Sequence, residues 1–185
     1  MASNREALRK FTRKFPPPPE VADLLLKLQL DSPMAAAITG AALADAALEQ
    51  LLKSKFTSKD QNLIGRIFLN RGPLSDFDSK ILVAQAFGII TSRIAGELHC
   101  IKAIRNAFAH SRQPLAFDHE LIDREMRAMN IPNTIASGKF EEAKGIKFTN
   151  QDWYLLTISI LTIMLDQMGK TEKSGDAALR DALRE

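Results

Sequence analysis

The sequence predicts an all-α domain, an antiparallel helical bundle of about six to seven helices. Apolar residues recur every three or four positions through most of the chain, as in helices that bury one face. No segment of useful length alternates polar and apolar residues as a half-buried β-strand does. The length of 185 residues fits one domain with appended ends.

The first half of the chain contains three predicted helices. The first covers 20–30 and carries apolar residues on one face. The second covers 33–56, where Pro33 suits a first helical turn and eight alanines favour helix and close packing. The third covers 61–70 and ends at the stop signal Arg71-Gly72-Pro73.

The later helices are predicted from capping residues. Ser75 with Asp78, and Thr149 with Asp152, are spaced as capping boxes. Phe148 is placed to pack on Trp153 as a hydrophobic staple. The predicted starts are Ser75, about Ser92, Asp118 and Thr149, and the last long helix is predicted to end near Gly169.

The chain divides into three parts by charge. Residues 1–19 form a flexible basic arm with a polyproline spacer, Pro16 to Pro19, and a net charge of 5 − 1 = +4. Residues 20–169 form a single helical domain, and 170–185 form a charged tail. Because the whole chain carries +3, everything after the arm carries 3 − 4 = −1. We therefore expect DNA contact to be weak and to come from the arm.

A local surplus of positive charge interrupts this pattern between residues 53 and 71. Five basic residues there face one acidic residue, Asp60: Lys53, Lys55, Lys59, Arg66 and Arg71. A charge run of this kind is ordinarily a solvated face. The alternative is a contact with phosphate groups.

The helix predicted over 92–109 places two charges within its apolar stripe. Five residues define the stripe, and Glu97 and Arg105 fall inside it: Ile94, Leu98, Ile101, Ile104 and Phe108. A buried charge needs a partner or a polar cleft. Arg105 is therefore either a member of an architectural ion pair or a cleft residue that acts with His110. We expect it to be partly buried and bound by a carboxylate such as Asp76 or Asp78.

Arg105, Asn106 and His110 are the candidate functional residues. Arginine supplies a fork of donors for phosphate oxygens, histidine titrates near neutral pH, and Asn106 could orient the imidazole ring. The alternative is that His110 satisfies the last carbonyl groups of its helix. His99 and His110 lie ~16 Å apart along the helix axis, so we predict no metal site and no cofactor.

The remaining composition indicates a cytoplasmic protein without a membrane segment. The single cysteine, Cys100, forms no disulfide framework. The charged N-terminus does not resemble a secretory signal. The most apolar stretch, Trp153–Leu165, is too short to span a bilayer.

Two segments resemble the mannitol operon repressor family. They are Gly72-Pro73-Leu74-Ser75-Asp76-Phe77 and Ile101 through His110, with Leu115-Ala116-Phe117-Asp118 following. The likeness covers roughly residues 20–125. It implies a small all-α bacterial protein of the cytoplasm that regulates transcription of a sugar-alcohol operon. We interpret the chain as a regulator that acts mainly through protein partners.

Arg105 through His110 also resembles the R-x4-H pattern of HEPN helical domains. That resemblance implies a metal-independent endoribonuclease acting on RNA, or an inactive scaffold relative. In the active case His110 would be the acid/base, and Arg105 would stabilise charge on one phosphodiester. Whether the chain is an enzyme stays open, although we favour a non-catalytic role. A homodimer is expected, since two-fold dimers are the commonest assembly of small proteins.

Overall fold

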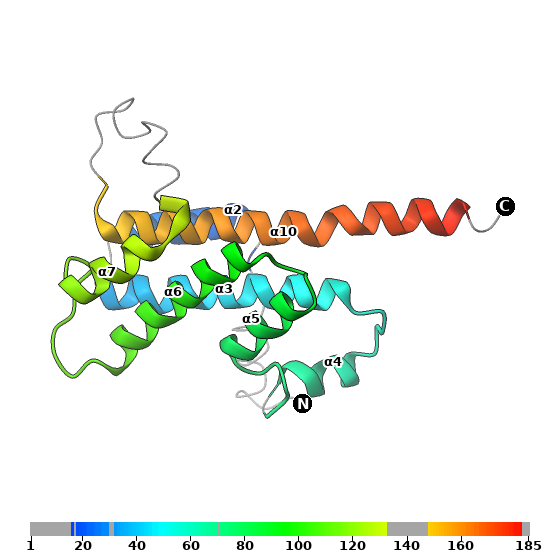
Figure 1. Ribbon diagram of the computed structural model, residues 1–185, viewed down its shortest axis with the longest axis horizontal. Helices are drawn as coiled ribbons and strands as arrows, with labels where there is room; N and C mark the ends of the chain where they lie inside the picture. Colours follow the sequence, from blue (N-terminus) through cyan, green and yellow to red (C-terminus); the bar gives the residue numbers. More distant parts are fainter. Residues whose placement is uncertain (1–15, 17, 30–31, 70, 133–147, 183–185) are drawn as a thin grey trace, which may run out of the picture.

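The computed structural model confirms the all-α prediction. It describes residues 16, 18–29, 32–69, 71–132 and 148–182, the side chains of 18–19 and 171–182 excepted, and these residues contain no β-strand. Seven helices are delimited within this part of the chain (Figure 1): α2 (Pro18–Gln29), α3 (Pro33–Lys55), α4 (Gln61–Phe68), α5 (Phe77–Ala86), α6 (Ser92–His110), α7 (Glu120–Ala128) and α10 (Asn150–Ala182). The predicted arm lies mostly outside the described residues.

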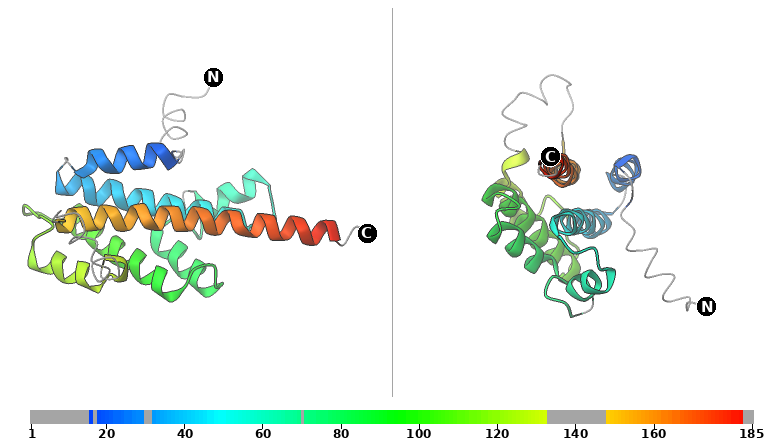
Figure 2. Two further views of the ribbon diagram at one scale, coloured as in Figure 1. Left: turned by 90° about the horizontal axis from the view of Figure 1, so that it is seen from above. Right: turned by 90° about the vertical axis from the view of Figure 1, so that its right-hand side faces the viewer.

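The two long helices, α3 and α10, form the centre of the bundle. Figures 1 and 2 show them side by side and running in the same direction, with α2 antiparallel to α3. The predicted antiparallel packing thus holds for α2 and α3 but is wrong for the central pair, whose helices are separated in the chain by α4 to α7. Gly40 permits this close approach, since a Cβ there would lie 2.6 Å from Ile158 Cδ1. The hydroxyl group of Tyr154 also donates to the carbonyl oxygen of Ala37 at 2.9 Å. Helices α5, α6 and α7 pack on another side of this pair.

By length and composition, α3 could cross a membrane, and it is the one described helix that could. More than half of its apolar window is buried inside the bundle. Ten of its residues are buried, and it contacts α2, α5, α6 and α10. These features are those of the core helix of a bundle.

Several helix boundaries agree with the sequence signals. Pro33 occupies the first turn of α3, and the side chain of Ser32 caps that helix. The capping box before α10 is reciprocal: the backbone N–H of Thr149 donates to Asp152 Oδ2 at 2.9 Å, and that of Asp152 donates to Thr149 Oγ1 at 3.2 Å. The rings of Phe148 and Trp153 lie 5.0 Å apart, as the predicted staple requires.

Several boundaries differ from the prediction. Helix α2 begins at Pro18, so the last two prolines of the predicted spacer belong to its first turn, where proline fits a helix. Asp76, not Ser75, caps α5, because its carboxylate accepts both the backbone N–H and the hydroxyl of Ser79. His119, not Asp118, caps α7, with Nδ1 accepting the N–H of Leu121 at 3.3 Å. Helix α10 continues past Gly169 to Ala182. An isolated glycine costs about 1 kcal/mol in a helix and weakens it without necessarily ending it, and α10 contains two, Gly169 and Gly175.

Candidate functional site

Helix α6 carries the residues singled out from the sequence, and its apolar stripe is buried as predicted. Thr91 caps its first turn through an N–H of Ile94. The five stripe residues are all buried: Ile94, Leu98, Ile101, Ile104 and Phe108. They pack α6 against α3 and against α5 and α7. The helix therefore holds its last two turns in a fixed position on the bundle.

Glu97, the other charged residue in the apolar stripe, is buried and hydrogen-bonded, but its partners are backbone N–H groups and not a cation. Its side chain is 1% exposed. Its Oε1 accepts the backbone N–H groups of Asn130 and Ile131, which follow the end of α7. Its Oε2 has no hydrogen-bond partner in the described part of the chain. The carboxylate thus joins α6 to the chain after α7.

Arg105 is exposed, so the prediction of a partly buried arginine bound by Asp76 or Asp78 is wrong. Its Nη1 donates to the neighbouring Asn106 Oδ1 at 2.9 Å. At this end of α6, Ile104 and Phe108 define the buried side, and Arg105 lies at its margin, where a long side chain reaches water.

The two carboxylates expected to bind Arg105 have other partners. Asp76 is occupied by the cap of α5. Asp78 accepts a hydrogen bond from Lys102 Nζ, and its Oδ1 lies 3.7 Å from His99 Nδ1. Asp78 therefore joins α5 to α6 one turn or more before Arg105.

Arg105 makes no described ion pair, and its charge has only a minor effect on Asp45 of α3. Burial raises the pKa of Asp45, the hydrogen bond and charge of Lys80 oppose that rise, and the charge of Arg105 adds to the opposition. Burial also raises the pKa of Tyr154, again opposed by Arg105. The exposed guanidinium group thus makes only a small electrostatic contribution to these two buried side chains.

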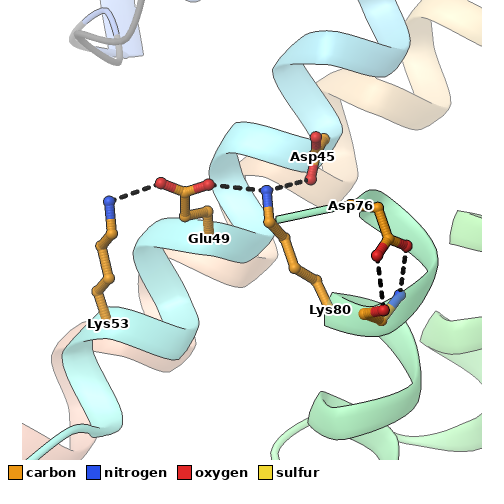
Figure 3. Close-up of polar contacts among 6 residues, drawn as sticks. Asp45, Glu49, Lys53, Asp76 and Lys80 are labelled. Carbon is orange, nitrogen blue, oxygen red and sulfur yellow. Dashed lines mark hydrogen bonds and ion pairs between the residues drawn. The ribbon is translucent and has the colours of Figure 1, made fainter. Parts of the chain in front are cut away.

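A polar cluster between α3 and α5 was not predicted from the sequence (Figure 3). Lys80, on α5, is 3% exposed. Its Nζ donates to Asp45 Oδ1 at 2.8 Å and to Glu49 Oε2 at 2.7 Å, both on α3. Lys53 Nζ donates to Glu49 Oε1 at 2.6 Å. The four side chains form one chain of alternating charge from α5 along α3.

The electrostatics of the cluster follow from this pairing. Burial opposes the charge on Glu49, but its hydrogen bonds with Lys53 and Lys80 outweigh burial and lower its pKa. Burial likewise opposes the charge on Lys80, and its bonds to Asp45 and Glu49 leave its pKa raised. The cluster therefore keeps Glu49 and Lys80 charged in the neutral pH range.

Two features of the sequence could have indicated this polar cluster. Lys80 lies within the stripe formed by Phe77, Ile81 and Ala84, where a lysine is as unexpected as Arg105 on α6. Asp45 and Glu49 are four residues apart, so they share one face of the alanine-rich helix. Only the packing of α5 on α3 shows that these features meet.

His110 and Asn106 are the other two residues of the predicted site. His110 is exposed and is the last residue of α6. No described contact joins it to Arg105 or Asn106, and the Asn106 oxygen is occupied by Arg105. The structure thus brings Arg105 and Asn106 together and leaves His110 apart at the helix end.

The described residues contain no group of three His, Cys, Asp or Glu side chains that could hold a metal ion. Cys100 is buried, and burial together with the charge of Glu125 raises the pKa of its thiol to about 12. The thiol is therefore protonated at neutral pH and is a poor nucleophile.

Solved structures with a similar fold include two regulatory or regulator-like proteins. One is a possible transcriptional regulator, YggD, from Shigella flexneri, with a TM-score of 0.61 and 15% identity over 80% of this chain and 98% of that chain. The other is MtlR from the MtlR–HPr complex of Escherichia coli, with a TM-score of 0.59 and 15% identity over 78% of this chain and 97% of that chain. The chain shares their fold over almost their whole length. No protein-family model and no curated protein matches the sequence.

Proposed function

We propose that this chain is a bacterial transcription-regulatory protein that acts by binding another protein. The observation that carries the proposal is the fold shared with MtlR, which is described in a complex with HPr, over 97% of that chain. The likeness to a possible transcriptional regulator supports the same class of function. Sequence segments around Gly72 and Arg105 independently resemble the mannitol operon repressor family.

The charge distribution supports a protein partner over direct reading of DNA bases. The chain after residue 19 carries a net charge of −1, counted as 3 − 4 from the sequence. The sequence shows no helix-turn-helix signature. Under this proposal the protein is cytoplasmic and forms a homodimer. Light scattering that finds a monomer at about tens of micromolar would argue against the dimer.

Isothermal titration calorimetry tests the proposal. The full-length chain is titrated with the HPr of the same organism, with an unrelated protein of similar size as the control. We expect heat of binding with HPr and none with the control protein. The absence of binding to HPr, together with sequence-specific nanomolar binding of operator DNA in a gel shift, would replace the proposal with a DNA-reading repressor.

The second candidate is a metal-independent endoribonuclease of the HEPN type. The observation that favours it is the exposure of both Arg105 and His110 on the last two turns of α6. Incubation of the purified chain with labelled RNA and a chelator separates the two candidates. Cleavage products that disappear in both Arg105→Ala and His110→Ala would support the enzyme, and intact RNA would exclude it.

A further inference from the structure

The segment from Thr57 to Arg71 forms a positively charged surface at the edge of the bundle. Its helix, α4, follows the C-terminal end of α3 and lies beside the main bundle in Figure 1. Ile64 and Phe68 are its buried residues, and Phe68 packs on Phe56 with ring centroids 5.6 Å apart. The helix is thus fixed by one face, and its other face is open.

The backbone brings Arg71 close to Arg66 at the C-terminal end of α4. A Cβ at Gly72 would lie 2.3 Å from the carbonyl oxygens of Arg66 and Ile67, so the chain folds back directly over the last turn. The backbone N–H of Leu74 donates to Ile67 O at 2.9 Å and fixes this return. Arg71, which precedes Gly72, is therefore held near Arg66. Both side chains are exposed, and neither has an ion-pair partner among the described residues.

The remaining polar side chains of this surface include further hydrogen-bond donors. Lys59 is exposed, and its Nζ donates one hydrogen bond to Phe56 O, which leaves two N–H groups. Asp60 is the one acidic residue of the segment, and its carboxylate already accepts the N–H of Asn62. Thr57, Gln61 and Asn62 are exposed beside these groups.

We infer that this α4 surface (Thr57, Lys59, Gln61, Asn62, Arg66 and Arg71) binds the phosphodiester backbone of a nucleic acid without reading its sequence. Arginine, lysine, threonine, asparagine and glutamine are the side chains that contact phosphate oxygens in such complexes. Asn62 and Arg66 share the outward side of α4. Within α4, Gln61 and Arg66 are five residues apart, ~7.5 Å along the helix axis, about two base-pair steps of one DNA strand.

The same features argue against an acidic protein as the occupant. A stable protein interface needs a buried apolar centre with aromatic or aliphatic anchors. On the exposed face of α4 only Leu63, 42% exposed, offers large apolar area. Donor side chains and charge dominate instead. The inference is independent of the proposed protein partner and adds a second binding surface to the regulator.

Fluorescence anisotropy tests the inference with the full-length chain. The probes are a labelled DNA duplex of arbitrary sequence, a labelled single-stranded RNA and a labelled polyglutamate peptide. The test variant is Arg66→Glu with Arg71→Glu. The control is Arg124→Glu with Arg127→Glu on α7, which causes the same change in net charge at residues 69% and 79% exposed.

We expect the α4 variant to bind nucleic acid about tenfold more weakly than the control at about 50 mM salt. The slope of log affinity against log salt should fall by about 2, one for each lost phosphate contact. A larger effect on DNA than on RNA, or the reverse, identifies which nucleic acid is bound. Equal binding by the two variants would overturn the inference, as would binding of polyglutamate without either nucleic acid. Circular dichroism verifies that both variants are folded.

Discussion

Lys80 on α5 donates to Asp45 on α3 at 2.8 Å, with its side chain 4% exposed in the ion pair. The same ammonium group donates to Glu49 at 2.7 Å. Since a buried ammonium group is costly unless it is paired, these two bonds fix α5 on α3 in one register.

Replacement of Lys80 should strongly destabilise the fold. Lys80→Met leaves two carboxylates facing one another without their shared cation, so the free energy of unfolding should fall by about 3 kcal/mol. Lys102→Met is the matched control, because Lys102 pairs with the half-exposed Asp78 and should cost less than about 1 kcal/mol. Urea denaturation measures both. Equal losses would show that the Lys80 cluster contributes no more than a surface pair.

Removal of Glu97 should also be costly. Glu97→Ala leaves the N–H groups of Asn130 and Ile131 without their acceptor. We expect a loss of about 2–4 kcal/mol in the free energy of unfolding. Glu97→Gln keeps the Oε1 acceptor and should lose less than half of that. A glutamine variant as unstable as the alanine variant would mean that the negative charge, and not the hydrogen bonds, is what matters.

Alkaline pH should destabilise the protein through Tyr154. Burial raises the pKa of this phenol above its ordinary 10.0, so the folded state holds the proton more tightly than the unfolded chain. The contribution of the protonated Tyr154 phenol to the free energy of unfolding is fully present below pH 10.0. It is lost as the pH rises above 10.0 toward the raised pKa of the folded state. Lys80, with a raised pKa, acts in the same direction above 10.5.

Tyr154→Phe removes the ionisable phenol and so separates its contribution to the pH dependence of stability from that of Lys80. The free energy of unfolding of this variant should fall less steeply with pH above 10.0 than that of the natural chain. Because the chain has one tyrosine, its phenolate absorbance reports the titration directly. Ionisation of the folded protein at the ordinary pKa would contradict the buried environment.

Glycine substitutions should distinguish a required glycine from a dispensable one. A Cβ at Gly72 would lie 2.3 Å from two backbone oxygens, so Gly72→Ala should cost about 1–3 kcal/mol. At Gly96, within α6, a Cβ would meet nothing within 4 Å. Gly96→Ala should therefore stabilise the protein by up to about 1 kcal/mol through helix propensity. Thermal unfolding of the two variants should shift the midpoint in opposite directions.

Arg105→Ala should change stability little. The side chain is exposed, and its one described hydrogen bond is to the adjacent Asn106. We expect a change within about 0.5 kcal/mol, and the same for His110→Ala. A collapse of only the Arg105 variant in thermal unfolding would mean that its charge on Asp45 stabilises the core far more than an exposed group should.

Most helices of this protein follow from local features of its amino-acid sequence. Periodic apolar residues, Pro33 in a first turn and the Thr149–Asp152 capping box are local signals, because each depends on residues within about one turn of one another. The boundaries that failed did so by one residue at Ser75 and Asp118, where a neighbour, Asp76 or His119, made the cap. The predicted end at Gly169 was also wrong, because α10 continues through Gly169 and Gly175 to Ala182.

Contacts between side chains on different helices could not be predicted from these local features. The wheel of α6 placed Glu97 and Arg105 in the same stripe, yet packing buried the first and left the second in water. It also carried Lys80 to Asp45, 35 positions away in the chain. Local pattern fixes the direction in which a side chain leaves its helix. The neighbour that it reaches depends on how the helices pack, and that is set by the volume and shape of the whole core.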